Sequence, residues 1–447
     1  MRLIPLFLKQ LTTRLQARHA VEIAWVLVSQ VAALIGGLLL LKLLTNLLPA
    51  ATFGYVSLIS IAIIFPTWLL FLPFSQALIR FYSAYKEKGD LRQLIGTARR
   101  GYLFSSLCVI ALGCVAALLG LQHKAGISTV DLGLSVGLLI VEAWRGLALG
   151  ICAADRRRIV IAKQSALEAC LRPILVYAFI TAFGPWVHSV LAAYVCSSLL
   201  LVVLVHSALR KIIPEIDKVD YDSRLVGSML RYGFPMGIAA IFSWGQSYAD
   251  RFVVAVLLGV DVAGQYAAAL QLCQFPFVAG ASFLSILIGP VANQMAGDAR
   301  SAEATARGTR IIAVATAVFA SLGLLLIPAY YVFGELLTRL VASKEYVMPA
   351  TLIAMLAIGA FLKSVGNLLG QDFLVKNRTD RFLAMFVVLG TASPVICYLL
   401  ISSYRLYGAA IALLIVGAIY ALGAGLAMKF VRRRPLFNSG RVINPPL

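Results

Sequence analysis

The chain contains an internal repeat, and this duplication constrains its architecture more than any other feature. The first copy is Leu47-Leu48, Gly54 and Phe65-Pro66. The second copy has the same internal spacing and follows about 210 residues later, as Leu257-Leu258, Gly264 and Phe275-Pro276. Two similar halves in one very apolar chain are typical of secondary transporters, in which a pathway runs between the halves.

A polar pattern downstream strengthens the evidence for duplication. The pattern has six matched positions, Gly89-Asp90-x-Arg92-x4-Thr97-Ala98-Arg99 and Gly297-Asp298-x-Arg300-x4-Thr305-Ala306-Arg307. Chance readily explains matches among common apolar residues, but it explains a polar pattern at equivalent places in both halves much less well. The two halves therefore descend from one unit.

The composition indicates a polytopic membrane protein. Of 447 residues, 61% are hydrophobic and 13% are charged, whereas soluble domains have roughly a quarter of their residues charged. Apolar runs of about 20 residues alternate with short polar breaks, as a hydrocarbon core of about 30 Å requires of helices. We predict an all-α fold with twelve transmembrane helices, at about 23–47, 55–78, 101–121, 132–153, 165–184, 188–207, 232–257, 265–290, 311–332, 349–369, 382–403 and 407–428.

These spans divide the chain into two six-helix lobes, related by an axis along the membrane normal. We expect an amphipathic segment at the membrane surface (1–22), an N-lobe (23–207), a linker (208–231), a C-lobe (232–428) and a basic tail (429–447). The first segment intersperses Arg and Lys among apolar residues and lacks a small-residue cleavage site, so we do not expect a cleaved signal peptide.

The net charge of +20 follows mainly from membrane topology. If both termini are cytoplasmic, the cytoplasmic segments hold 30 of the 39 Lys and Arg residues, as the positive-inside rule requires. This asymmetry predicts a multi-pass protein of the plasma membrane with both termini inside. It also removes the reason to expect a nucleic acid partner.

Several function classes lack their signatures in this sequence. There is no phosphate-binding Gly-x4-Gly-Lys-Ser/Thr, no His-Glu-x-x-His and no Gly-x-Ser-x-Gly motif. The seven cysteines lie within apolar runs without a Cys-x-x-Cys, and the four histidines are scattered, so we expect no disulfide frame, metal site or cofactor. The longest predicted outer loop, at about 333–348, is too short for a catalytic domain, so we predict a transporter and no enzymatic activity.

Four basic residues within predicted spans stand out, namely Arg145, Arg172, Arg251 and Lys363. Inserting an ionisable side chain into the membrane at that depth costs at least about 2.5–3.5 kcal/mol, so such a side chain normally faces the protein interior or water. We predict that the four line one cavity and bind an anionic head group of the substrate. Pyrophosphate is the predicted group, because arginine binds phosphate oxygens through two parallel hydrogen bonds.

Three acidic residues accompany these cations, namely Glu142, Glu168 and Asp250. Glu142 lies three residues before Arg145 and Glu168 four before Arg172, so each pair shares a helix face. The carboxylates are candidates for ion coupling. The alternative is that the pairs neutralise themselves and stabilise helix packing. For Lys363 the alternative is that its side chain reaches to the membrane surface.

Two prolines and three aromatic residues are further candidates. Pro66 and Pro276 lie mid-span, where a proline frees a carbonyl and permits a bend. They are either paired hinges for alternating access or static kinks. Trp144, Trp244 and Tyr248 either stack on sugar rings in the cavity or pack between helices.

Four segments together resemble one known family. They are "LLPAATFGYVSL", "ALIRFYSAY", "RYGFPMGIAAIFSWGQSYADRFVVAVLLGVDVAGQYAAA" and "NQMAGDARSAEATARGTR". In order and spacing they resemble the Wzx-type polysaccharide flippases of the multidrug/oligosaccharidyl-lipid/polysaccharide exporter superfamily. The most specific part is Tyr232-Gly233-Phe234-Pro235, followed by Asp250-Arg251, Gly259 and Gly264-Gln265-Tyr266.

The resemblance implies twelve helices in two lobes around a central cavity, in the bacterial inner membrane. It implies movement of an undecaprenyl-pyrophosphate-linked oligosaccharide, such as an O-antigen or other surface polysaccharide repeat unit, to the outer leaflet without ATP. It also implies contacts with membrane lipid and with other polysaccharide-assembly membrane proteins. Two alternatives remain open at this stage: a cation-coupled multidrug or metabolite antiporter of the same fold, and a membrane polysaccharide polymerase or ligase.

Overall fold

The computed structural model describes residues 17–213, 220–297, 302–376 and 378–430, and nearly all of them are helical. The first half contains α2 (Ala17–Leu47), α3 (Ala50–Ala62), α4 (Ile64–Pro66), the π-helical turn η1 (Thr67–Phe71), α5 (Leu72–Lys88), α6 (Leu91–Leu118), α7 (Leu121–Lys124), α8 (Thr129–Ala154), α9 (Arg158–Phe183) and α10 (Val187–Ile212). The second half contains α11 (Ser223–Leu258), α12 (Val260–Gly297), α13 (Ala302–Val341), the 3-10 turn η2 (Lys344–Tyr346), α14 (Ala350–Val375) and α15 (Thr379–Phe430).

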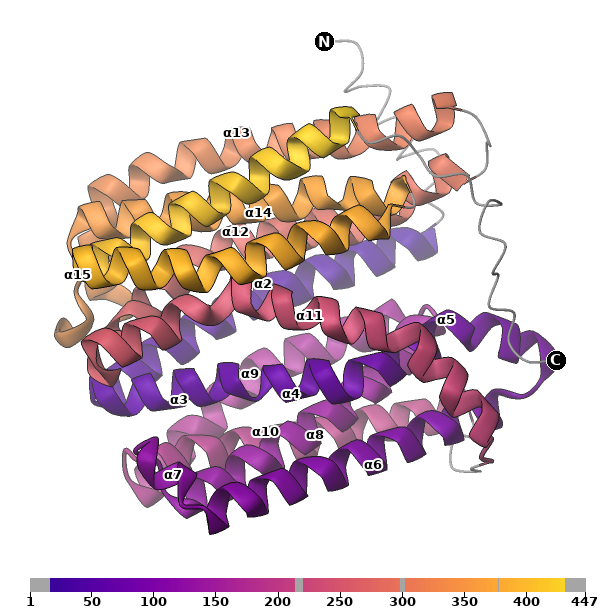
Figure 1. Cartoon of the computed structure of the whole chain (residues 1–447), viewed down its shortest axis with the longest axis horizontal. Coiled ribbons are helices and arrows are strands. Elements are labelled where there is room, and N and C mark those ends of the chain that lie inside the picture. Colours follow the sequence, from indigo (N-terminus) through magenta and orange to yellow (C-terminus); the bar gives the residue numbers. More distant parts are fainter. Residues whose placement is uncertain (1–16, 214–219, 298–301, 377, 431–447) are drawn as a thin grey trace.

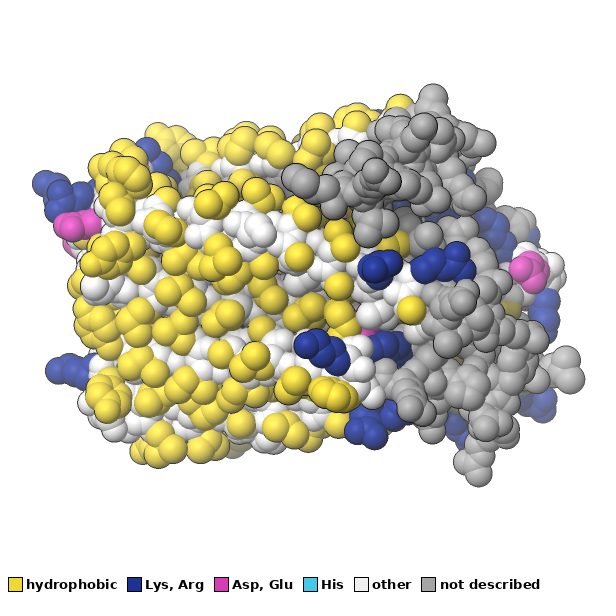
Figure 2. Space-filling view, turned by 90° about the horizontal axis from the view of Figure 1, so that it is seen from above, with side chains coloured by type: hydrophobic (Ala, Val, Ile, Leu, Met, Phe, Trp, Pro, Cys, Tyr) yellow, Lys and Arg dark blue, Asp and Glu magenta, His cyan; other side chains and the backbone are white. Residues whose placement is uncertain are grey.

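Eleven of the described helices are long and apolar enough to cross a membrane. The last of them, α15, is 52 residues long and contains a non-helical residue, Arg405, with φ 53° and ψ −130°. The chain reverses there, and Figure 1 shows the two halves of α15 lying side by side. The predicted all-α fold with about twelve spans is therefore confirmed. Figure 2 shows the hydrophobic belt that these helices present between two charged ends.

The helices form two lobes, which Figure 1 shows one above the other. In the N-lobe, α8, α9 and α10 pack on one another and α2 packs along α9. In the C-lobe, α14 packs between α13 and α15, and α11 packs along α15. The lobes meet where α3 contacts α12 and where α5 contacts α11.

The repeated glycines lie at the symmetry axis between the lobes. A Cβ atom on Gly54 of α3 would lie 2.1 Å from the carbonyl oxygen of Val260, and one on Gly264 of α12 would lie 2.2 Å from that of Ala50. Ala50 and Val260 are themselves equivalent positions of the repeat. The two contacts are thus reciprocal, as a two-fold relation requires. The glycines are repeated because no side chain fits between α3 and α12 at this crossing.

Local turn chemistry explains where several spans end. Gly89 follows α5 with φ +82°, a left-handed conformation that glycine adopts readily, and α6 starts two residues later. Gly259, with φ +103°, alone separates α11 from α12. Ser128 and Asp131 form a reciprocal capping box at the start of α8.

The helices extend beyond most of the predicted spans. α13 covers 302–341 where 311–332 was predicted, and α10 and α11 extend into the segment predicted as a linker, 208–231. Hydropathy detects the part of a helix that lies in hydrocarbon, whereas a helix continues into the polar region beyond it. The predicted amphipathic segment (1–22) and the basic tail (429–447) lie largely outside the described residues.

Candidate functional site

The N-lobe holds a four-membered ion cluster that joins α8 to α9. Arg145 donates from Nε to Glu142 Oε2 at 2.8 Å and pairs through Nη1 with Glu168 Oε2. Arg172 pairs with Glu142 Oε1 through Nη2 and with Glu168 Oε1 through Nη1, the latter at 3.1 Å. Each arginine therefore contacts both glutamates. The pairs predicted at i,i+3 and i,i+4 are confirmed, and the structure adds two pairs between the helices.

Two residues of α10 complete this cluster. Ser198 donates its hydroxyl to Glu142 Oε1 at 2.6 Å. The guanidinium of Arg172 lies over the ring of Tyr194, 5.3 Å from its centroid. Neither residue was predicted from the sequence. A serine and a tyrosine four residues apart share a helix face, but within an apolar run such a pair does not indicate a functional site.

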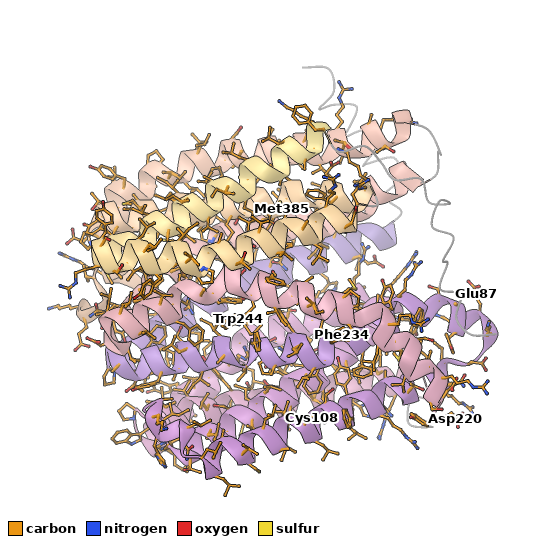
Figure 3. All side chains as sticks on the ribbon, viewed as in Figure 1. Glu87, Cys108, Asp220, Phe234, Trp244 and Met385 are labelled. Atoms are coloured by element: carbon orange, nitrogen blue, oxygen red, sulfur yellow. The ribbon has the colours of Figure 1, made fainter. Side chains whose placement is uncertain are left out.

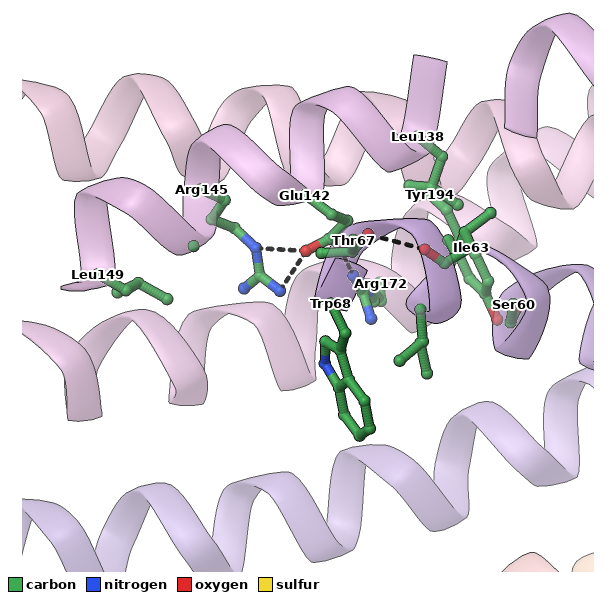
Figure 4. Close-up of a pocket in the computed structure, with 12 residues that line it drawn as sticks. Ser60, Ile63, Thr67, Trp68, Leu138, Glu142, Arg145, Leu149, Arg172 and Tyr194 are labelled. Carbon is green, nitrogen blue, oxygen red and sulfur yellow. Dashed lines mark hydrogen bonds and ion pairs between the residues drawn. The ribbon is translucent and has the colours of Figure 1, made fainter. Parts of the chain in front are cut away.

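The cluster opens into a cavity of about 380 Å³. Glu142, Arg145, Arg172 and Tyr194 form part of the wall, and Glu168 is not among the lining residues. The region around the end of α3, α4 and η1 contributes Ser60, Thr67 and Trp68. Figure 4 shows Glu142, Arg145, Arg172 and Trp68 among the lining residues. The side chains of Arg145 and Arg172, which both line the cavity, are 15% and 26% exposed. Trp68 was also not predicted.

The transmembrane helix that lines the cavity is broken at Pro66. α3 ends at Ala62, α4 ends at Pro66, and the π-helical turn η1 follows before α5 resumes the α-helix. Trp244 of α11 donates its indole N–H to the carbonyl of Ile61 at 3.0 Å, and its ring lies 5.4 Å from that of Phe65. π-Helical turns within α-helices often mark functional sites. Here the turn directs Thr67 and Trp68 into the cavity, beside a contact between the lobes.

The equivalent proline of the second half does not break its helix. Pro276 lies within α12, which is continuous from Val260 to Gly297. When Leu47 is aligned with Leu257, the position equivalent to Trp244 is Leu34, whose side chain has no hydrogen-bond donor. The two proposed hinge positions, Pro66 and Pro276, are thus structurally different in this conformation.

The C-lobe holds a second polar cluster, on α11 and α12. Tyr266 donates its hydroxyl to Asp250 Oδ2 at 2.8 Å, and Arg251 donates to Gln274 Oε1 at 3.4 Å. The guanidinium of Arg251 also lies 5.4 Å from the ring centroid of Tyr248. Asp250 and Arg251 are 7% and 5% exposed. The adjacent Asp and Arg therefore bond to α12 or to the backbone.

Lys363 of α14 lies near this C-lobe cluster. It is close enough to Asp250 and Arg251 to interact electrostatically with both. No ion pair of Lys363 within 4.0 Å occurs among the described residues, and Asp250 Oδ1 likewise lacks a hydrogen-bond donor there. Lys363 is thus a membrane-embedded cation whose nearest carboxylate has unused acceptor capacity.

The structure places the four predicted cations in two groups. Arg145 and Arg172 line the N-lobe cavity, whereas Arg251 and Lys363 belong to the C-lobe cluster and are absent from that lining. Aromatic rings lie between the groups: Trp68, which lines the cavity, is 6.5 Å from Tyr248, over which Arg251 lies. Among the described residues, the cavity described above is thus lined by two of the four predicted cations, and a common site for all four stays a prediction.

The predicted aromatic residues have separate surroundings. Trp144 packs against Tyr102 within the N-lobe core, with ring centroids 5.8 Å apart. Trp244 and Tyr248 of α11 lie at the contact between the lobes, with ring centroids 6.3 Å apart. In the described part of the chain, no group of three or more His, Cys, Asp or Glu residues could hold a metal ion. The chemistry available is therefore ion pairing, hydrogen bonding and aromatic contact.

Residues 20–296 match the family described as "Polysaccharide biosynthesis protein". The chain belongs to this family. The resemblance to the Wzx-type flippases is confirmed, because the match spans most of the chain. A comparison with curated protein sequences found no significant match.

Solved structures of similar fold are transporters. An inward-facing multidrug resistance MATE family transporter of the MOP superfamily has a TM-score of 0.69 and 14% identity, over 89% of this chain and 94% of its own. The outward-facing conformation of such a transporter has a TM-score of 0.62 and 15% identity, over 91% and 95%.

A MOP superfamily transporter from Pyrococcus furiosus has a TM-score of 0.63 and 15% identity, over 91% of this chain and 96% of its own. It is described as having a binding pocket of reverse polarity that suggests a different function. At these identities the likeness shows the fold. Fold and family together identify this polysaccharide biosynthesis protein as a multi-pass membrane transporter or flippase.

Proposed function

We propose that the protein is a flippase for lipid-linked oligosaccharides. In this proposal it moves an undecaprenyl-pyrophosphate-linked repeat unit, of O-antigen or another surface polysaccharide, from the cytoplasmic to the outer leaflet of the bacterial inner membrane. Both termini are cytoplasmic, and the movement is driven by an ion gradient through alternating access of the two lobes.

The observation that supports this proposal is the charge within the membrane of a member of this family. Arg145, Arg172, Arg251 and Lys363 lie on membrane-spanning helices and are buried or partly buried. Only three carboxylates accompany these four cations, and the excess cation suits an anionic pyrophosphate. Closure of the lobes around a substrate would bring both groups to one ligand.

The carboxylates Glu142, Glu168 and Asp250 are the proposed coupling groups. A carboxylate beside an arginine stays ionised, so a proton carrier has to lose its arginine partner during the cycle. Substrate pyrophosphate competing for Arg145 or Arg172 would leave a glutamate free to bind a proton. Release of the substrate would restore the ion pairs and expel the proton.

A second candidate is a cation-coupled multidrug or metabolite antiporter. One observation favours it: in the N-lobe cluster the two glutamates fully neutralise the two arginines, so this half of the site has no excess positive charge. The transporter fold gives no support to the other alternative, a membrane polysaccharide polymerase or ligase.

Flipping by the purified protein in vesicles, with and without an imposed pH difference, tests the proposal. Wild-type protein should move a lipid-linked oligosaccharide, and faster with the gradient. Glu142→Gln or Glu168→Gln should retain movement but lose its dependence on the gradient. Movement of cationic drugs and none of lipid-linked glycan would favour the antiporter. Retention of wild-type gradient dependence by Gln variants of all three carboxylates would make these residues structural partners.

Topology is tested by reporter fusions after Lys88 and after Arg300, which follow equivalent spans of the two halves. Both should report the cytoplasm. A periplasmic result at one of them alone would contradict the parallel relation of the lobes.

A further inference from the structure

The N-lobe cavity has an unusual combination of properties: no net charge, many hydrogen-bonding groups and one aromatic wall. Two arginines and two glutamates line or adjoin it, and every one of the four is ion-paired. A pyrophosphate could bind the guanidinium groups here only by displacing a glutamate. A neutral ligand could bind without breaking any of these pairs.

The cluster retains unused hydrogen-bonding capacity. A guanidinium has five N–H donors. Arg145 uses three of them, one from Nε and one from each Nη, on Glu142 and Glu168. Arg172 directs both Nη atoms at acceptors, but its Nε has no acceptor among the described residues. That Nε atom is itself buried, so the donors left for a ligand are the remaining N–H groups of the Nη atoms.

The opposite side of the cavity carries a partly uncovered indole. Trp68 lies on the π-helical turn η1 and lines the cavity. Its contact with Tyr248 is tilted by 51° at a centroid separation of 6.5 Å, so Tyr248 does not stack on the indole face. Figure 4 shows Trp68 near Arg145 and Arg172, with its indole directed away from Glu142. Trp68 is half-buried and lines the cavity, so it offers apolar surface to a ligand that also needs polar partners.

We infer that this cavity is a subsite for a sugar ring. A pyranose has a face of C–H groups that packs on an aromatic ring, and an edge of hydroxyls that both donate and accept hydrogen bonds. The cavity supplies Trp68 for the face and the glutamate and arginine groups for the edge, and its volume of about 380 Å³ lies in the range of ligand pockets. This inference rests on the proposed function and adds to it: before the lobes close on the substrate, the N-lobe cavity holds a sugar ring of the glycan while the pyrophosphate lies near Lys363.

The test uses the full-length protein in detergent and two soluble probes. One is the free oligosaccharide released by mild acid from the lipid-linked precursor of the host cell; the other is inorganic pyrophosphate. The chain has five tryptophans, so intrinsic fluorescence reports on few sites. The oligosaccharide should change the emission of the wild-type protein. Trp68→Phe should remove that change, and Trp68→Ala should weaken oligosaccharide binding in calorimetry about ten-fold.

Trp144→Phe is the matched control, because Trp144 packs in the N-lobe core and does not line the cavity. This variant should keep both the emission change and the affinity. Lys363→Ala should weaken binding of pyrophosphate more than binding of oligosaccharide. An unchanged elution profile and circular dichroism spectrum establish that each variant is folded.

Three results would overturn the sugar subsite: no oligosaccharide-dependent emission change in the wild type, an undiminished change in Trp68→Phe, or the same change produced by pyrophosphate alone. Flipping assays on the intact lipid-linked glycan separate this failure from failure of the proposed function. Wild-type flipping without Trp68-dependent oligosaccharide binding would refute the subsite alone, whereas an absence of wild-type flipping would refute the proposed function.

Discussion

The two lobes carry polar clusters that the duplicated chain has made different. In the N-lobe, two arginines and two glutamates form four ion pairs across α8 and α9 and border a cavity. In the C-lobe, Asp250 and Arg251 bond to Tyr266 and Gln274, and Lys363 has no ion pair among the described residues. The N-lobe cluster is neutral, because all its charges are paired with one another. The C-lobe cluster has an excess positive charge.

This difference shows that two lobes of common origin can present different polar groups to one substrate. Figure 3 shows side chains filling both lobes. A self-neutralised cluster resists rearrangement, because each charge that loses its partner remains in a medium of low dielectric. An unpaired ammonium in such a medium has most to gain from an anionic ligand.

The largest effect is expected when the N-lobe cluster is broken. Arg145→Ala leaves Glu142 and Glu168 with one guanidinium between them, at sites where their side chains are only 20% exposed. Breaking a buried pair on one side costs roughly 3–5 kcal/mol. We expect a clear fall in thermal stability, measured by the fraction of soluble monomer after heating in detergent, together with loss of glycan export.

The matched control is the double variant Arg145→Leu with Glu168→Leu, which leaves one glutamate paired with one arginine. It should recover most of the stability without recovering export. If Arg145→Ala alone unfolds at the wild-type temperature, the N-lobe cluster is not the interdependent unit described above.

Substitution of Lys363 is expected to reduce stability less than Arg145→Ala does, but to abolish export in the same way. Because Lys363 has no ion pair among the described residues, Lys363→Met should change the free energy of unfolding by no more than about 1 kcal/mol. Export should nevertheless be lost, since the excess cation is removed. A destabilisation as large as that of Arg145→Ala would show that Lys363 is a structural partner of Asp250, and the contrast between the lobes would fail.

A substitution of Trp244 tests why the helix is interrupted near Pro66 but continuous at Pro276. Trp244→Phe keeps an aromatic ring beside Phe65 but removes the hydrogen bond to the Ile61 carbonyl. The loss should be about 1 kcal/mol. Hydrogen exchange should increase at residues 61–67 and remain unchanged around Pro276. Unchanged exchange at 61–67 would mean that the break persists without the contact between lobes.

The smallest effect is expected for an ion cluster at the membrane surface, which serves as a reference for the buried ones. Asp155, at the end of α8, pairs with Lys86 and Arg157, whose side chains are 57% and 45% exposed. Burial raises the pKa of Asp155, but hydrogen bonds and charges from Lys86 and Arg157 more than offset this, so its pKa is lowered. The carboxylate therefore contributes stability above its unfolded pKa, and the contribution is lost as pH falls through the folded pKa.

Asp155→Asn should lower the free energy of unfolding by less than about 1 kcal/mol at neutral pH, because solvent screens the charges of Lys86 and Arg157. The difference from wild type should shrink as the pH falls below about 4, the ordinary pKa of an aspartate. Melting curves of both proteins between pH 3 and pH 7, at roughly one-unit steps, provide the measurement. A difference that grows towards acid pH would contradict the lowered pKa.

The sequence by itself determined the fold class, the number of spans and the duplication. These depend on hydropathy and on repeated residues, and both are properties of the linear chain. The turn between the last two spans illustrates this: the predicted gap at 404–406 contains Arg405, where the structure reverses direction. The pairs Glu142–Arg145 and Glu168–Arg172 were predictable for a similar reason, since helical periodicity alone places them on one face.

Only the tertiary structure decided which groups meet across helices. The bonds of Glu142 to Arg172 and Ser198, and of Asp250 to Tyr266, depend on how the spans rotate and cross, which hydropathy does not encode. The separation of the four cations into two groups has the same origin. The asymmetry of the two prolines is also tertiary, because Trp244 of one lobe reaches the carbonyl of Ile61 in the other. The Phe-Pro pair that the two halves share is therefore followed by different backbone paths, and its partners in space differ.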